Sequence, residues 1–214
     1  MIVSCSGIDG SGKTELARRL ATELARFDLD AECVRPRYVC NDIVKRFCAT
    51  RFGDPNTHVA NIRPGTYIAA LLLDWLDLLH ETLDGHATRV LVCDRYVFDV
   101  MAQAIHYGAE VEPVLDLLRF FPSPNVSFFL DVAPPVAHAR LIARREPPIH
   151  ALESLDHLET LAEAYLSVRA HLAWRPVILG AEIDMQAVVR SVLAAAQGSP
   201  EPAASGQGQG DRRC

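Results

Sequence analysis

The sequence has little lysine and little positive charge. Of its 21 basic residues only Lys13 and Lys45 are lysines, and acidic residues outnumber basic ones, which gives a formal net charge of −6 at pH 7. No stripe of basic residues stands out, although binding to a nucleic-acid backbone depends on one. We therefore expect no nucleic-acid partner. A lysine kept at position 13 in an arginine-rich chain is expected to have a specific role.

Features that mark several other classes of protein are also missing. The six cysteines form no C-x-x-C pair and no spacing with histidine that is typical of a zinc site. The most apolar stretch, residues 67–83, contains acidic residues, so we expect no membrane span. The apolar run at residues 1–5 is too short for a signal peptide. Unpaired cysteines without a signal peptide are typical of a reducing compartment, so we expect a cytoplasmic protein.

The composition itself is that of a folded domain. The chain has 214 residues, of which 50% are hydrophobic, and this is enough to bury a core without disulfides or metals. We expect one domain over residues 1–196. Residues 197–214 are mostly Gly, Pro, Ser, Ala and Gln, without aliphatic or aromatic core residues, which predicts a disordered tail.

Short apolar runs alternate with longer amphipathic ones through the domain. The predicted strands are residues 1–6, 31–34, 89–93, 126–132 and 176–179. The predicted helices are residues 13–27, 66–83, 99–107, 111–120, 135–145, 152–174 and 185–196. This alternation predicts a three-layer α/β fold, with a parallel sheet of about five strands covered by helices on both faces. Ligands of such sheets bind at the carboxyl ends of the strands.

Residues 7–14 read G-I-D-G-S-G-K-T, directly after the first predicted strand and at the start of a helix. This is the P-loop pattern G-x-x-x-x-G-K-[ST] in the context that it requires. Its glycines let backbone N–H groups surround phosphates, its lysine reaches the β- and γ-phosphates, and its hydroxyl ligates Mg²⁺. An ordinary glycine-rich turn is the alternative. The pattern predicts a site for ATP and Mg²⁺ made by Gly7, Asp9, Gly10, Ser11, Gly12, Lys13 and Thr14.

A second motif, Asp94-Arg95-Tyr96, follows the apolar strand at residues 89–93. An acid at the tip of a neighbouring strand can hold Mg²⁺, directly or through water, so we predict that Asp94 and Thr14 form the metal site. The planar fork of Arg95 can clamp a phosphate or a carboxylate. The alternative is a surface Asp–Arg pair that caps a helix.

A third group consists of the arginines that follow the strand at residues 126–132. Arg140 and Arg144 are four residues apart, so they share one helix face, and Arg145 follows directly. Phosphoryl transfer spreads negative charge over the moving group, and arginines on a mobile lid stabilise that charge. We predict that these three arginines act in catalysis with Lys13 and Arg95. A solvated basic helix face is the alternative.

In this order the motifs resemble those of the thymidylate kinase family, over roughly residues 1–195. The similar segments are the P-loop, D-R-Y, residues 128–145 and A-E-A-Y-L at residues 162–166. The resemblance implies a P-loop NTPase-type fold with a small lid, and transfer of the γ-phosphoryl group of Mg-ATP to a small-molecule acceptor, by family default a nucleoside monophosphate such as dTMP. It also implies that Asp9 lies near an acceptor hydroxyl, that Arg95 holds the acceptor phosphate with Arg35 nearby, and that a homodimer can form.

The acceptor side departs from the family pattern. Asp99 replaces the usual serine, Gln103 replaces an aromatic that stacks on thymine, and Trp75 replaces an arginine. Asp99 can contact the acceptor or act as a base, or it can cap the next helix. We expect Tyr67 and Trp75 to be core or subunit-interface residues. Position 10 is glycine where some members carry arginine, so the stabilising arginine would come from the lid.

Two other functions stay open at this point. One is phosphoryl transfer to a non-nucleotide hydroxyl compound, which would explain a rewritten acceptor side. The other is an ATP-binding regulatory protein without transfer chemistry. The guanine-reading pattern N-K-x-D is absent from the sequence, which argues against a GTPase.

Overall fold

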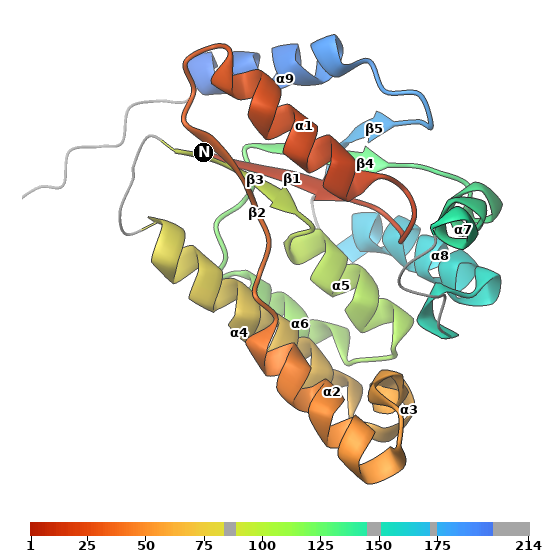
Figure 1. The fold of residues 1–214 in the computed structure, drawn as a ribbon. Coiled ribbons are helices and arrows are strands. Elements are labelled where there is room, and N and C mark those ends of the chain that lie inside the picture. The colour runs from red at the N-terminus through yellow and green to blue at the C-terminus, as the bar shows by residue number, and fades with distance from the viewer. Residues whose placement is uncertain (84–88, 145–150, 172–174, 199–214) are drawn as a thin grey trace, which may run out of the picture.

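The structure is a computed structural model that describes residues 1–83, 89–144, 151–171 and 175–198 (Figure 1). Its strands are β1 (Ile2–Ser6), β2 (Ala31–Val34), β3 (Val90–Asp94), β4 (Val126–Leu130) and β5 (Val177–Leu179). Its α-helices are α1 (Lys13–Ala25), α2 (Val39–Phe52), α3 (His58–Asn61), α4 (Pro64–Leu83), α5 (Val97–His106), α6 (Val111–Leu118), α7 (Pro134–Ala143), α8 (Leu155–His171) and α9 (Met185–Gly198). Two short 3-10 helices are η1 (Pro55–Thr57) and η2 (Ala151–Glu153).

The sheet confirms the predicted α/β fold. Its order is β2-β3-β1-β4-β5, and every neighbouring pair is parallel. Figure 1 shows α1 and α9 on one face of the sheet and α4, α5 and α8 on the other. Parallel strands place all their carboxyl ends at one edge, so the loops after β1 and β3 meet there.

Alternation along the strands divides the core between the two faces. Val3 and Cys5 of β1 pack with the apolar residues of α1 and α9, whereas Ile2 packs with those of α4, α5 and α8. β3 divides in the same way, with Val92 on the first face and Leu91 on the second. Successive side chains of a strand point to opposite faces, and a run of apolar residues therefore reads as a strand that is covered on both sides.

The region between β2 and α4 was not predicted from the sequence. It contains α2, η1 and α3, none of which the sequence pattern indicates. The N-terminus of α2 is held by Asp74 of α4, whose carboxylate accepts hydrogen bonds from the backbone N–H groups of Cys40 at 2.7 Å and Asn41 at 3.0 Å. A capping group 33 residues away leaves no local signal, which explains why the helix start was missed.

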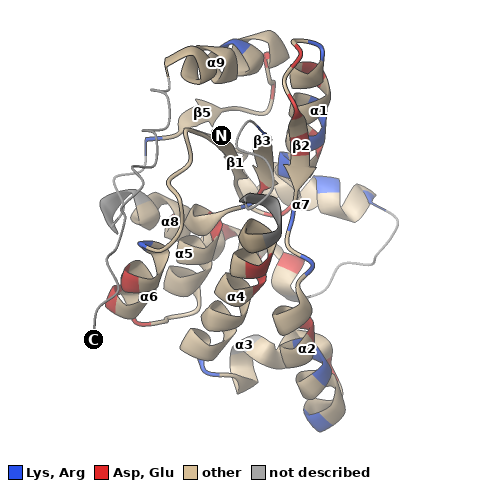
Figure 2. Ribbon diagram, turned by 90° about the vertical axis from the view of Figure 1, so that its left-hand side faces the viewer, with Lys and Arg blue, Asp and Glu red and all other residues tan. Residues whose placement is uncertain are grey.

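The other predicted elements exist, with boundaries that shift by a few residues. The helix predicted over residues 152–174 begins as η2, and α8 then runs over Leu155–His171. α9 extends to Gly198, so the first two residues of the predicted tail are helical, and the rest of it, residues 199–214, lies outside the described residues. Residues 145–150, where the resemblance implies a lid, also lie outside them. Among the described helices, none is long and apolar enough to cross a membrane. Figure 2 shows basic residues on α1, α2 and α9, with acidic residues beside them on α1 and α2.

Candidate functional site

A cavity of about 990 Å³ lies at the carboxyl edge of the sheet. The P-loop forms one wall, and residues from α2, α4, α5, α7 and α8 form the others. The predicted site residues that line it are Asp9, Gly10, Ser11, Gly12, Lys13, Thr14, Arg35, Arg95, Asp99, Arg140 and Arg144. The three sequence motifs therefore meet in one place, as the resemblance implies.

The P-loop is shaped by glycines with positive φ. Gly10 and Gly12 have φ values of +80° and +98°, which L-residues with a side chain rarely adopt. Gly10 also lies against α7, where a methyl group at this position would be 2.9 Å from the carbonyl carbon of Ala137. Position 10 therefore has no room for the arginine that some family members carry there.

Lys13 points along the inside of the P-loop. Its ammonium group donates hydrogen bonds to the carbonyl oxygen of Ile8 at 2.8 Å and to Oδ1 of Asp9 at 3.3 Å. Burial lowers the pKa of Lys13 below its ordinary value, and the positive charge of Arg95 lowers it further. Lys13 is thus a desolvated cation, which attracts phosphate more strongly than an exposed one would.

Thr14 and Asp94 lie side by side, as predicted for a metal site. The Thr14 hydroxyl donates to Oδ2 of Asp94 at 2.7 Å, and Asp94 is buried. The other oxygen, Oδ1, is buried without a hydrogen-bond partner among the described residues. Hydroxyl and carboxylate oxygens suit Mg²⁺, which takes one or two carboxylates and completes its shell with water and phosphate. These residues therefore fit a magnesium ion.

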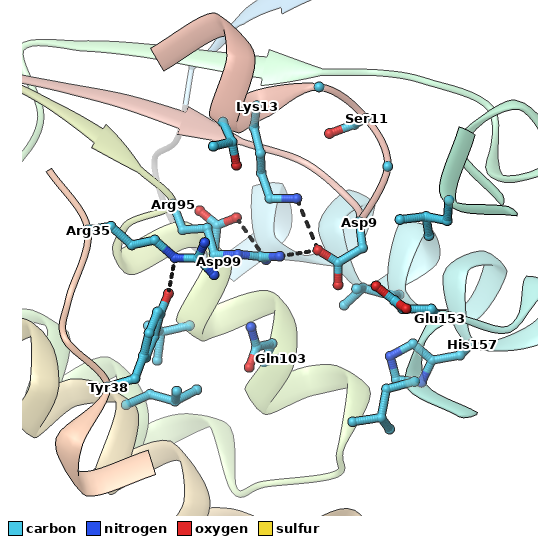
Figure 3. Close-up of a pocket in the computed structure, with 18 of the residues that line it drawn as sticks. Asp9, Ser11, Lys13, Arg35, Tyr38, Arg95, Asp99, Gln103, Glu153 and His157 are labelled. Carbon is cyan, nitrogen blue, oxygen red and sulfur yellow. Dashed lines mark hydrogen bonds and ion pairs between the residues drawn. The ribbon is translucent and has the colours of Figure 1, made fainter. Parts of the chain in front are cut away.

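Arg95 reaches the P-loop from the end of β3. It has a φ of +76°, unusual for a residue with a side chain, and its guanidinium group donates a short hydrogen bond to Oδ1 of Asp9. Burial alone would raise the pKa of Asp9, but Arg95 and Lys13 outweigh it and hold that pKa well below its ordinary value. One carboxylate oxygen thus bridges a P-loop cation and a β3 cation (Figure 3).

Asp99 has the capping role that the sequence left open. Its Oδ2 accepts hydrogen bonds from the Tyr96 backbone at 2.9 Å, which caps α5, and from the Ser6 hydroxyl at 2.7 Å. Its Oδ1 accepts one from the Tyr165 hydroxyl at 2.5 Å and lies 3.8 Å from Arg95. Burial raises the pKa of Asp99, against the opposing effects of Arg95 and these hydrogen bonds. Asp99 thus places a carboxylate beside the guanidinium group of Arg95, and both of its own oxygens accept hydrogen bonds from the protein.

The predicted lid arginines differ in their surroundings. Arg140 of α7 donates to the carbonyl oxygen of Ser11 at 3.3 Å, so it already touches the P-loop. Arg144 pairs with the buried carboxylate of Glu153 at 2.6 Å. Arg145 lies outside the described residues. Glu153 was missed from the sequence because its partner lies across the segment 145–150 and no motif marks it.

Arg35 stands at the mouth of the cavity, where β2 ends. Its guanidinium carbon lies 5.1 Å from the ring centre of Tyr38, its Nε donates to the Tyr38 hydroxyl at 3.4 Å, and Nη1 lies 3.9 Å from Asp94. Tyr38 was not predicted as a site residue, although its place just after a strand that ends at this edge was a signal. Tyr67 and Trp75 are buried in the core, as expected, and also line the cavity.

Comparison with known proteins shows which family the chain belongs to. The family model described as thymidylate kinase matches residues 68–192, more than half of the chain. The chain belongs to the thymidylate kinase family. A thymidylate kinase of Xanthomonas oryzae pv. oryzae (strain PXO99A) is 29% identical over 165 residues, which are 74% of this chain and 67% of the relative. A thymidylate kinase of Xylella fastidiosa (strain 9a5c) is 29% identical over 174 residues, 78% of each chain.

Two of the departures from the thymidylate kinase pattern, at positions 75 and 99, have physical explanations in the structure. Trp75, which replaces an arginine, packs edge-on against Tyr96 with ring centres 5.1 Å apart and is 2% exposed. Asp99 accepts hydrogen bonds inside the protein. These two substitutions therefore change the support of the cavity wall, and Gln103 of α5 lines the cavity (Figure 3).

Proposed function

We propose that this kinase transfers the γ-phosphoryl group of Mg-ATP to the phosphate of a nucleoside monophosphate, dTMP or a close analogue. The observation that carries the proposal is the single Asp9 oxygen that bridges Lys13 and Arg95. Lys13 belongs to the loop for the donor phosphates, and Arg95 belongs to the neighbouring strand end. Two cations that share one atom hold two phosphates close enough for direct transfer.

The reaction requires little covalent chemistry from the protein. An acceptor phosphate oxygen forms a bond to the γ-phosphorus, the bond from that phosphorus to the β–γ bridging oxygen breaks, and ADP leaves. Lys13 would neutralise charge on the β- and γ-phosphates, and Arg140 would do so beside the P-loop. Thr14 and Asp94 would hold Mg²⁺, which neutralises charge on the β- and γ-oxygens when bound. Arg144 would join after leaving Glu153.

A phosphate acceptor suits this site better than a hydroxyl acceptor. A phosphate monoester is largely ionised at neutral pH and needs no base, whereas an alcohol must lose a proton. The low pKa of Asp9 makes its carboxylate a weak base. Both oxygens of Asp99 accept hydrogen bonds within the protein. Neither acid beside Arg95 is therefore set up to deprotonate an alcohol.

We also propose a homodimer. α2 and α4 pack together and leave large apolar side chains exposed on neighbouring surfaces: Val39, Ile43 and Phe47 on α2, and Leu73 and Leu76 on α4. An exposed apolar patch of this kind marks an interaction surface more often than free solvent contact. A second copy of the chain is the partner that the family resemblance implies.

The first experiment measures ADP release from Mg-ATP with a panel of acceptors. The panel contains dTMP, dUMP, other nucleoside monophosphates, nucleosides, sugars and amino alcohols. Lys13→Ala sets the background: we expect its kcat to fall by roughly a hundredfold or more, because the lost cation neutralises transferring charge. Arg18→Ala, an exposed arginine on the same helix, should keep its activity.

The outcomes separate the three functions. Turnover with dTMP supports the proposal. Turnover only with compounds that lack phosphate would establish a kinase of another acceptor. Binding of Mg-ATP without any phosphorylated product would establish a regulatory protein, and activity retained in Lys13→Ala would refute phosphoryl transfer at this site.

A further inference from the structure

Asp9 lies between two cations of the site. Its Oδ1 accepts hydrogen bonds from Lys13 and Arg95, two groups that belong to different elements and approach it from different directions (Figure 3). Lys13 is 5% exposed and Arg95 is 14% exposed, whereas Asp9 is 36% exposed. Lys13 is thus buried and Arg95 is largely covered, whereas their shared counter-ion is more exposed and lines the cavity.

The contacts of the Asp9 carboxylate with Lys13 and Arg95 resemble those that a bound phosphate would make. A phosphate oxygen and a carboxylate oxygen make the same charge-assisted hydrogen bonds to ammonium and guanidinium groups. Without an anion between them, Lys13 and Arg95 would be two desolvated like charges, and the positive charge of Arg95 already lowers the pKa of Lys13. A carboxylate at this point keeps the site folded and ready before substrates arrive.

We propose that Asp9 is a placeholder anion, which occupies the junction of the two phosphate-binding cations and must yield Lys13 and Arg95 to the donor and acceptor phosphates. The inference rests on the proposed function, because it takes Lys13 and Arg95 as the two phosphate ligands. It assigns Asp9 a positioning role in addition to the contact with an acceptor hydroxyl that the family resemblance implies.

The two roles make different predictions for Asp9→Asn. A placeholder competes with phosphate, so a neutral amide at this position should tighten binding of anions at Lys13. A residue that only holds an acceptor hydroxyl leaves the affinity for the donor unchanged and weakens the affinity for the acceptor. A rise in donor affinity therefore supports the placeholder role, and an unchanged donor affinity with a weaker acceptor affinity supports the hydroxyl contact alone.

The experiment titrates inorganic tripolyphosphate, and separately Mg-ATP, into the full-length protein by calorimetry. Tripolyphosphate serves as probe because it tests the cations without depending on the acceptor's identity. We expect Asp9→Asn to bind it roughly tenfold more tightly than the unchanged protein, since a competing hydrogen-bonded charge is removed. In turnover assays the KM for ATP and kcat should fall together, because products also leave more slowly.

Asp42→Asn is the matched control. Asp42 lies on α2, lines the same cavity and has no bond to Lys13 or Arg95 in the described part of the chain. Its substitution changes the charge of the cavity by the same amount, so it shows how much of an effect is general electrostatics. We expect a change of less than about twofold for this variant.

Stability supplies a second readout. Without its counter-ion the empty site should be less stable, so Asp9→Asn should melt at a lower temperature and gain more from added tripolyphosphate than the unchanged protein does. Asp9→Ser repeats the test with a smaller side chain, in case the amide makes new bonds.

The possible results are distinguishable. Equal or weaker binding of tripolyphosphate by both Asp9 variants, with normal binding by the unchanged protein, overturns the placeholder role and leaves the proposed function standing. Failure of the unchanged protein to bind Mg-ATP and tripolyphosphate overturns both. An equal gain in affinity for Asp42→Asn would attribute the effect to net charge and also overturn the inference.

Discussion

Gly10 and Ala137 lie so close together that a Cβ at residue 10 would overlap the backbone of α7. The P-loop and the helix that carries Arg140 are therefore in direct backbone contact. This contact places Arg140 within 3.3 Å of the Ser11 carbonyl oxygen. A glycine at position 10 thus allows Arg140 of α7 to approach the P-loop. The same close contact leaves no space for an arginine side chain at position 10 itself.

Substitution of Gly10 by alanine tests this contact. We expect Gly10→Ala to lower the melting temperature and to raise the KM for ATP, because α7 must move away from the P-loop. Gly53→Ala is the control: its φ is also positive, +84°, but nothing lies within 4 Å of a Cβ there, so it measures backbone strain alone, about 1–2 kcal/mol. If the two variants lose the same stability, the contact with Ala137 has no energetic role.

The proposed metal site predicts a specific response to magnesium. Asp94→Asn removes the carboxylate whose Oδ1 has no hydrogen-bond partner in the described part of the chain, so the Mg²⁺ concentration for half-maximal activity should rise by roughly tenfold or more. A titration of activity with Mg²⁺ at fixed ATP measures this shift. Asp131→Asn, directly after β4, which is separated from β3 by β1 in the sheet, should leave the curve in place. An unchanged Mg²⁺ requirement in Asp94→Asn would rule out Asp94 as a ligand.

His106 predicts a pH dependence of stability. Its Nε2 lies 3.2 Å from Nδ1 of His157, and burial lowers the pKa of His106 below its ordinary value of 6.5. The unfolded chain then binds a proton at a higher pH than the folded chain does, so the free energy of unfolding should fall as pH drops from about 6.5 towards the folded-state pKa. Urea unfolding at about pH 7.5 and about pH 5.5 measures this loss.

His106→Gln should flatten that part of the profile, because the titrating group is gone. His138→Gln, a histidine on α7 outside this pair, is the control and should keep the slope. A slope that persists unchanged in His106→Gln would assign the pH dependence to other groups.

The apolar surface on α2 predicts the site of dimerisation. Phe47→Glu should shift the protein from dimer to monomer at micromolar concentration, because a charge buried in an apolar interface is unfavourable. Sedimentation or light scattering measures the mass. Phe120→Glu, at a site 78% exposed beyond the end of α6, should leave the oligomeric state unchanged. A Phe47→Glu protein with the mass of the unchanged protein would place the interface elsewhere, or show that no dimer forms.

The local motifs were predictable because each is complete within a few residues. The P-loop needs only its glycines, Lys13 and Thr14 in sequence after a buried strand, and the parallel sheet follows from alternating apolar runs. Residues 94–96 were recognised as a site because they follow such a run. The lengths and order of these elements by themselves determined the α/β fold and brought the motifs to one edge of the sheet.

Only the tertiary structure decided the roles that depend on distant partners. Asp99 caps α5 by accepting from the Tyr96 backbone, and Ser6 and Tyr165 fix its carboxylate from β1 and α8. Arg144 is held by Glu153, which lies beyond residues 145–150. α2 starts where it does because Asp74 reaches it from α4. The sequence shows which residues are carboxylates, but a carboxylate can cap a helix, form an ion pair or react. Its role depends on which hydrogen-bond donors the fold brings within about 3 Å of it.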